Sequence, residues 1–177
     1  MNKVVVIDTC AIIHLMHINR FNLLENLNYS ALTTMFVQLE FDQGHDDSRR
    51  YFYSLLERGK LSSIPLEIDD LIEMANVPES KHASDAELSC FVVARRLGCR
   101  TMTDDGNATK FAKRHLGMDL KDILQLVDLI FEAYEVYVLG DYDLRSIQAT
   151  LAFNKFTLKF DLATEAARRH LMASAGI

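Results

Sequence analysis

The chain has 177 residues and a formal net charge of −6 at pH 7. This length suits one compact domain, or one domain with a helical appendage. Because 49% of the residues are apolar and 25% are charged, a disordered chain is excluded. No apolar run reaches the ~20 residues that a membrane-spanning helix needs, and the odd number of cysteines without metal-ligand spacing is typical of reduced thiols. We therefore expect a soluble, cytoplasmic protein.

The first predicted element is a short β-branched run over residues 3–7, which suits a strand buried on both faces of a parallel sheet. Asp8 ends this run, and residues 11–16 have helical patterning. A second strand is expected over residues 31–35, and it leads into a segment that ends at Glu40.

The middle of the chain continues this alternation. Residues 46–58 have the pattern of an exposed amphipathic helix, and residues 69–75 that of a shorter helix. Residues 61–68 between them suit a strand. Pro65 indicates an edge position for this strand, because proline cannot donate a hydrogen bond to a neighbour.

The clearest helix prediction covers residues 84–98. The segment begins with the capping pattern Ser84-x-x-Glu87, continues with periodic apolar residues and ends at Gly98.

A strand over residues 100–103 is expected next, and it ends directly before Asp104 and Asp105. Residues 108–115 are again helical in pattern. Strands that alternate with helices in this way predict an α/β fold with a parallel sheet flanked by helices.

The pattern changes in the last third of the chain. One long apolar helix is predicted over residues 120–138, and two more over 141–153 and 161–172. We therefore expect a sheet domain over residues 1–118 and a helical extension over 119–177. The apolar stripe of this extension suits packing on the domain or self-association into a homodimer.

Acidic residues lie at the carboxyl ends of the predicted strands and in the first turn of the helix at 84–98, at the edge where open parallel sheets bind ligands. They are Asp8, Glu40, Asp85, Glu87, Asp104 and Asp105. Two carboxylates ~4 Å apart repel by roughly 4 kcal/mol at an effective dielectric of about 20. Their pKa values therefore rise unless cations compensate. Mg²⁺ and Mn²⁺ prefer oxygen ligands, so the pattern predicts a divalent metal site.

Four segments together resemble the PIN-domain family. The first is the run Val4-Val5-Val6-Ile7-Asp8-Thr9-Cys10, which resembles the buried strand that delivers the family's first acid and a small hydroxyl residue. Glu40 falls at the position of the second acid. Ser84-Asp85-Ala86-Glu87-Leu88 and Thr103-Asp104-Asp105 resemble the third and fourth acid segments. The resemblance covers roughly residues 3–118.

This resemblance implies a metal-dependent nuclease fold, commonly an endoribonuclease. In bacteria and archaea such a protein is often the toxin of a toxin–antitoxin pair, and its partners are then an RNA substrate and an inhibitory antitoxin. A bound metal would lower the pKa of water, orient it at phosphorus and stabilise the leaving oxygen.

The resemblance also assigns residues. Asp8, Asp85 and Asp105 would hold one or two Mg²⁺ or Mn²⁺ ions, and Glu40 would act as a ligand or organise metal-bound water. A hydroxyl from Thr9 or Thr103 would fix one of the carboxylates.

Three positions leave alternatives open. The third acid is Asp85 or Glu87, and we favour Asp85 because the capping box directs Glu87 back to the helix terminus. The fourth acid is Asp104 or Asp105, and the Thr-x-Asp spacing favours Asp105. Cys10 stands where the family more often has Ser or Asn, which weakens any polar contact with substrate there.

Other polar residues give weaker signals. Lys110 and Lys113 lie on the helix after the site and could meet substrate phosphates, although a solvated face is the better explanation for most basic residues of this helix. His14 and His17 lack the spacing of a zinc site, and we interpret them as ordinary helix residues.

Two functions remain open from the sequence. The first is an active metal-dependent nuclease that acts on RNA, with DNA not excluded. The second is a non-catalytic PIN-like module whose helical tail mediates assembly. The negative net charge counts against nucleic-acid binding, but a bound metal offers positive charge to a phosphate. Because clustered carboxylates repel one another, the full set of acids favours the nuclease.

Overall fold

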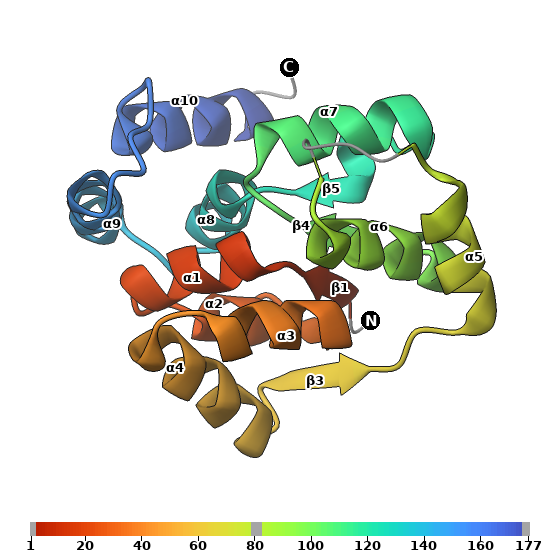
Figure 1. Cartoon of the computed structure of the whole chain (residues 1–177). Helices are drawn as coiled ribbons and strands as arrows, with labels where there is room; N and C mark the ends of the chain where they lie inside the picture. Colours follow the sequence, from red (N-terminus) through yellow and green to blue (C-terminus); the bar gives the residue numbers. More distant parts are fainter. Residues whose placement is uncertain (1–2, 79–82, 175–177) are drawn as a thin grey trace.

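The structure is a computed structural model that describes residues 3–78 and 83–174. Its centre is a five-stranded parallel sheet with the strand order β3-β2-β1-β4-β5 (Figure 1). The strands are β1 (Lys3–Ile7), β2 (Tyr29–Thr34), β3 (Leu61–Ile64), β4 (Arg100–Met102) and β5 (Ile123–Leu124). Helices flank the sheet, which confirms the predicted α/β class.

The helices predicted up to residue 118 are present, and Asn22–Asn26 form an additional short helix, α2, that the sequence pattern did not predict. The helices are α1 (Thr9–His17), α2 (Asn22–Asn26), α3 (Met35–Gln43), α4 (Asp46–Glu57), α5 (Ile68–Asn76), α6 (Asp85–Leu97), α7 (Gly106–His115), α8 (Leu126–Glu135), α9 (Asp141–Phe153) and α10 (Leu162–Ser174), with one 3-10 helix, η1 (Leu120–Asp122). Among the described residues, no helix combines the length and the apolar character needed to cross a membrane.

The central strand β1 is buried on both faces. Val5, Val6 and Ile7 have no exposed surface, and β1 pairs with β2 on one side and β4 on the other. The strand β3 lies at the edge of the sheet, as predicted, but the predicted extent of residues 61–68 is wrong: β3 ends at Ile64, directly before Pro65, and Ile68 already begins α5.

The predicted helix over residues 120–138 is wrong in its first part. Leu120–Asp122 form η1, Ile123–Leu124 form β5, and α8 begins only at Leu126. Apolar periodicity does not separate a buried strand followed by an amphipathic helix from one longer helix. Because β5 pairs with β4, the predicted boundary at residue 118 leaves one strand of the sheet in the supposed extension.

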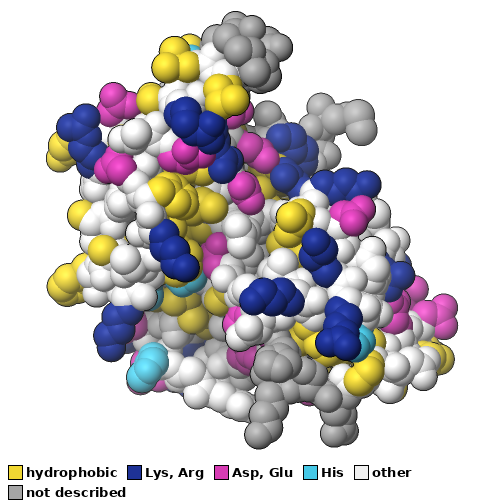
Figure 2. Space-filling model, turned by 90° about the horizontal axis from the view of Figure 1, so that it is seen from above, with side chains coloured by type: hydrophobic (Ala, Val, Ile, Leu, Met, Phe, Trp, Pro, Cys, Tyr) yellow, Lys and Arg dark blue, Asp and Glu magenta, His cyan; other side chains and the backbone are white. Residues whose placement is uncertain are grey.

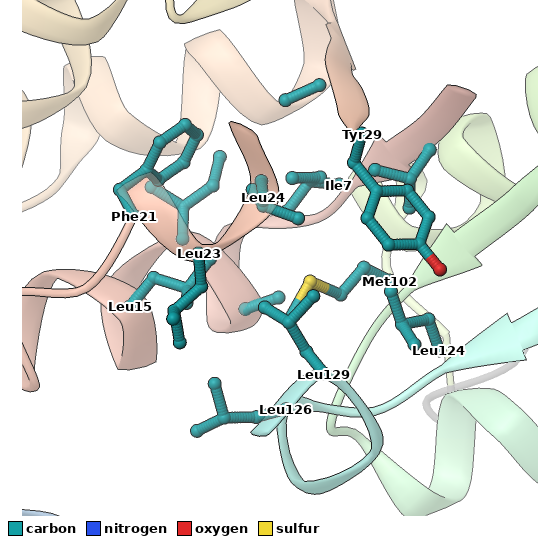
Figure 3. Close-up of a cluster of buried hydrophobic side chains, with 14 of the residues drawn as sticks. Ile7, Leu15, Phe21, Leu23, Leu24, Tyr29, Met102, Leu124, Leu126 and Leu129 are labelled. Atoms are coloured by element: carbon teal, nitrogen blue, oxygen red, sulfur yellow. The ribbon is translucent and has the colours of Figure 1, made fainter. Parts of the chain in front are cut away.

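The larger part of the core joins this late segment to the beginning of the chain. Figure 3 shows Leu124, Leu126 and Leu129 from β5 and α8 packed against Met102 of β4 and Ile7 of β1, with side chains of α1 and α2 beside them. These contacts make β5 and α8 part of the sheet domain.

A second, smaller apolar cluster lies on the other side of the sheet. It contains Phe91 and Val92 of α6, Ala108 and Ala112 of α7, and Ile123 of β5. Ile123 belongs to this cluster whereas its neighbour on β5 belongs to the first, and consecutive strand residues point to opposite faces. Both faces of the sheet are therefore covered, as a parallel sheet requires.

The helix α6 is held in place by ion pairs with α5. Asp70, whose side chain is only 2% exposed, accepts a hydrogen bond from Arg96 Nε at 3.0 Å, and Arg96 also pairs with Glu67 at 2.6 Å. The buried carboxylate of Asp70 thus depends on one guanidinium group for charge compensation.

Replacing Arg96 with Leu is expected to lower the free energy of unfolding by about 2 kcal/mol, because it leaves Asp70 buried without its cation and Arg96 is itself partly exposed. Urea unfolding followed by circular dichroism measures this change. The matched control is Arg50→Leu, which breaks an exposed pair with Asp47 on α4 and should stay within about 0.5 kcal/mol of wild type. Equal effects of the two substitutions would contradict the assignment.

Candidate active site at the carboxyl ends of the strands

Asp8 occupies the centre of the candidate site. Its backbone N–H donates to the carbonyl of Met102 at 3.1 Å, which extends the β1–β4 pairing by one residue. Its side chain is the N-cap of α1, and Oδ1 accepts a hydrogen bond from the N–H of Ala11 at 2.9 Å. The residue is only 1% exposed, so the strand delivers a carboxyl group into the protein interior.

Burial raises the pKa of Asp8 to about 7, although hydrogen bonds from Thr103, Ala11 and Cys10 oppose this rise. The Cys10 thiol donates to the carboxylate, with Sγ at 3.2 Å from each oxygen. Burial also raises the pKa of the Cys10 thiol well above its ordinary value. A thiol that stays protonated is a hydrogen-bond donor here and not a nucleophile.

Thr103 links Asp8 to the acid that follows β4. Its hydroxyl donates to the Asp8 carboxylate and accepts a hydrogen bond from the N–H of Asp105 at 3.1 Å. Asp105 is the N-cap of α7, and its Oδ1 accepts from the N–H groups of Asn107 and Ala108 at 2.6 and 2.9 Å. The hydroxyl therefore fixes the relative position of the two acids.

Glu40 of α3 lies near the same place. It accepts a hydrogen bond from the hydroxyl of Thr9, the residue that follows Asp8. Asp8, Thr9, Cys10 and Glu40 all line one cavity of about 210 Å³. The remaining residues that line it are Ile13, Ser84 and Glu87.

Glu87, and not Asp85, reaches this cavity from α6. Glu87 accepts a hydrogen bond from the N–H of Ser84 at 2.8 Å, as the capping box predicts. Burial raises the pKa of Glu87, and the nearby charges of Asp105 and Glu40 add to the rise. Asp85 begins α6 with an exposed side chain and does not line the cavity.

The capping role of Glu87 and a place at the site are compatible in this structure, because Ser84 itself lines the cavity. A carboxylate that turns back to Ser84 therefore also turns toward the site. The role of either residue as a metal ligand remains a prediction.

Asp104 makes contacts different from those of its neighbour Asp105. Its Oδ2 lies 2.8 Å from Nδ1 of His14, and its Oδ1 accepts a hydrogen bond from the N–H of Leu126 at 2.9 Å. Sequence reasoning missed His14, which lies 90 residues away from Asp104 along the chain. No local pattern signals a contact over that separation.

The types of side chain that line the cavity suit a hard divalent cation, but their present arrangement does not form a metal site. Three carboxylates line the cavity together with no Lys or Arg, and the pKa is raised at two of them, Asp8 and Glu87. Among the residues that the structure describes, however, no three Asp, Glu, His or Cys side chains are already gathered closely enough to hold a metal ion. Thr9 and Ser84 each bond only one carboxylate oxygen of Glu40 and Glu87, respectively, which leaves the second oxygen of each group for a cation.

Basic side chains lie outside the cavity. Lys110 and Lys113 are exposed on α7, which begins directly after Asp105. Figure 2 shows the face above α7 and α10, on which Lys and Arg side chains are dispersed with Asp and Glu side chains between them. The contact of Lys110 and Lys113 with substrate phosphates remains a prediction.

A larger cavity of about 500 Å³ lies away from these acids, beside β5. It is lined by side chains of mixed charge, including Arg100, Lys121, Glu132 and Arg169. None of the predicted site residues lines it, so it is separate from the candidate site.

The fold and the acids at the carboxyl ends of its strands define an α/β protein of the PIN type. A family model described as a PIN domain matches residues 4–164, and the chain therefore belongs to the PIN-domain family. The match extends past the predicted boundary at residue 118 and includes β5, α8 and α9. No curated protein matches the chain. PIN domains are generally nucleases.

Asp8→Asn should alter how the stability of the metal-free protein depends on pH. The unfolded carboxyl ionises near its ordinary pKa of 3.8, whereas the folded carboxyl stays protonated up to about 7. Wild type therefore loses stability as the pH rises from about 4 to 7, by at most about 4 kcal/mol, since one pKa unit corresponds to about 1.4 kcal/mol. Asn caps a helix as well as Asp and does not ionise, so it should lack this loss.

The measurement is urea unfolding in EDTA at several pH values between 4 and 8. The difference in unfolding free energy between Asp8→Asn and wild type should grow with pH over this range. Asp47→Asn, at an exposed position on α4, is the control and should follow wild type. A constant difference between Asp8→Asn and wild type would show that the buried carboxyl is not the group responsible.

Proposed function

We propose that the protein is a divalent-metal-dependent nuclease that hydrolyses phosphodiester bonds of RNA. The observation that carries this proposal is the grouping of Asp8, Glu40 and Glu87 around one cavity at the carboxyl ends of the strands. Asp105 adds a fourth acid, close enough to raise the pKa of Glu87. The membership of the chain in the PIN-domain family supports the same class of reaction.

Asp8, Glu40, Glu87 and Asp105 are the residues that would hold Mg²⁺ or Mn²⁺. When bound, the metal would supply a Lewis acid and lower the pKa of coordinated water. Hard cations of this kind select carboxylate oxygens over the thiol of Cys10.

The other residues of the site would position these acids. Thr103 donates to Asp8 and accepts from the backbone of Asp105, and Thr9 donates to Glu40. Such hydrogen bonds orient a carboxylate and limit its rotation. Cys10 donates to Asp8 and thereby offsets part of the cost of burying a carboxylate.

RNA is proposed as the polymer because the sequence segments at the site resemble those of PIN-type endoribonucleases. The exposed Lys110 and Lys113, next to the site on α7, would attract its phosphates. Control by an inhibitory protein such as an antitoxin, and assembly into a homodimer, belong to the same proposal. Exposed apolar side chains on α5, such as Ile68 and Ile72, offer a surface for such contacts.

A second function is favoured by one observation. The acids at the site already have hydrogen-bond donors within the protein, and no metal-binding group is preassembled among the described residues. A PIN-domain protein that binds partners without catalysis would be consistent with this arrangement.

Cleavage of end-labelled single-stranded RNA and DNA of matched sequence, with Mn²⁺, Mg²⁺ or EDTA, tests the two functions. We expect RNA cleavage that requires metal. Glu87→Gln should reduce it by at least about 100-fold, more than the ~10–100-fold expected for a residue that only supports a ligand. Gln at this position keeps the capping contact with Ser84, so the loss would reflect the charge.

Asp85→Asn is the matched control because it removes an acid of the same helix turn that does not line the cavity. It should retain cleavage close to the wild-type rate. A larger loss in Asp85→Asn than in Glu87→Gln would restore Asp85 as the third acid. Absence of metal-dependent cleavage of either polymer by wild type, at a rate above that of Asp8→Asn, would favour the binding module.

A further inference from the structure

Asp104 is a second buried acid at the carboxyl ends of the strands, and both of its carboxylate oxygens have a partner. Its side chain is only 3% exposed, and its two oxygens have separate partners, His14 Nδ1 at 2.8 Å and the N–H of Leu126 at 2.9 Å. Its backbone N–H donates to Cys10 Sγ at 3.3 Å. One residue therefore joins α1, the connection from β4 to α7, and the first residue of α8.

These contacts surround the acids of the proposed site without being part of it. Cys10, which accepts from Asp104, donates to the carboxylate of Asp8. Asp105 follows Asp104 directly and is fixed by Thr103. Any shift of Asp104 therefore moves the donors that orient Asp8 and the segment that carries Asp105.

The C-terminal part of the chain contacts this network through Phe156, which lies between α9 and α10. The ring centroids of Phe156 and His14 are 4.3 Å apart, with an interplanar angle of 53°. The His14 side chain is only 18% exposed, and the ring of Phe156 packs against it. The segment after α9 thus supports the residue that pairs with Asp104.

We propose that Asp104 is a positioning residue and not a metal ligand, and that the C-terminal segment maintains the geometry of the site through Phe156, His14 and Asp104. This inference rests on the proposed metal-dependent function, which it deepens. It also gives the C-terminal helices a role beyond packing. In a carboxylate metal ligand the negative charge contributes directly to cation affinity, whereas a positioning residue needs only two correctly placed hydrogen-bonding groups.

Asparagine separates the two roles because it is nearly isosteric with aspartate. Its Oδ1 accepts from the N–H of Leu126, and its Nδ2 donates to Nδ1 of His14 when the imidazole proton is on Nε2. Asp104→Asn therefore keeps the contacts and removes the charge. Asp104→Ala removes both, and Asp105→Asn removes the charge of the proposed ligand.

The first measurement is Mn²⁺ binding by electron paramagnetic resonance, with the intact chain and these three variants. Asp104→Asn should bind within about threefold of wild type, whereas Asp104→Ala should lose the ~10–100-fold typical of a lost supporting contact. Asp105→Asn should lose at least as much as Asp104→Ala. Equal losses in Asp104→Asn and Asp105→Asn would overturn the positioning role, because they would make Asp104 a ligand.

The second measurement is amide hydrogen exchange without metal, which does not depend on the proposed function. The N–H groups of Asp104, Asp105 and Leu126 each report one hydrogen bond of the network. Phe156→Ala should accelerate their exchange about tenfold by increasing local opening. Phe153→Ala, at an 87% exposed position of the neighbouring helix, is the control and should leave the rates unchanged.

The two measurements distinguish a failure of the proposed function from a failure of the inference about the C-terminal segment. If wild type binds no Mn²⁺ and cleaves no substrate, the proposed function is overturned, and exchange alone decides whether the network exists. If Phe156→Ala and Phe153→Ala give the same exchange rates at these three amides, the C-terminal segment does not maintain the site and the inference is overturned.

Discussion

The burial of one carboxyl group, that of Asp8, is the constraint on which the rest of the site depends. A central strand covered on both faces ends at this residue and leaves it 1% exposed. A buried carboxylate without partners is strongly unfavourable, and its donors come from two segments: the Ala11 N–H and the Cys10 thiol of α1, and the Thr103 hydroxyl after β4. Because each donor belongs to an element that packs beside β1, the same contacts determine the packing around β1 and the positions of the acids.

Helix capping is the means by which the fold gathers acids at this edge. Asp8 caps α1, Asp105 caps α7, Glu87 completes the capping box of α6, and Asp104 accepts from the first residue of α8. The N–H groups at a helix N-terminus stabilise a nearby carboxylate. Clustered acids therefore stabilise the fold through helix capping even without a metal. Repulsion between carboxylates does not by itself require a metal here, and the shared cavity and the family membership support the metal site instead.

Much of the fold could be predicted because its signals are local. The β-branched run of β1, the capping box and Gly98 of α6, and Pro65 after β3 each specify an element within a few residues. β5 escaped prediction because two apolar residues carry no period of their own. The contact between His14 and Asp104 escaped because it joins positions 90 residues apart. The capping role of Glu87 made it look less suited to the site than Asp85, but in the structure the capping residue also lines the cavity, because Ser84 lies there too.

The same bonds that stabilise the acids also define what a cation would have to overcome. Glu40 and Glu87 now accept from Thr9 and Ser84, and Asp8 has a pKa raised to about 7 by burial. A metal ligand must be deprotonated. At neutral pH, cation binding would therefore release the proton from those molecules in which Asp8 is protonated, and coordination bonds would take the place of some hydrogen bonds. Asp8 and Asp105 have short side chains and are fixed as helix caps, whereas Glu40 and Glu87 have longer side chains and project from helices. The two aspartates would therefore set the position of a cation, and the two glutamates would adjust to it. That division of roles follows from side-chain length and from where each residue stands in the fold.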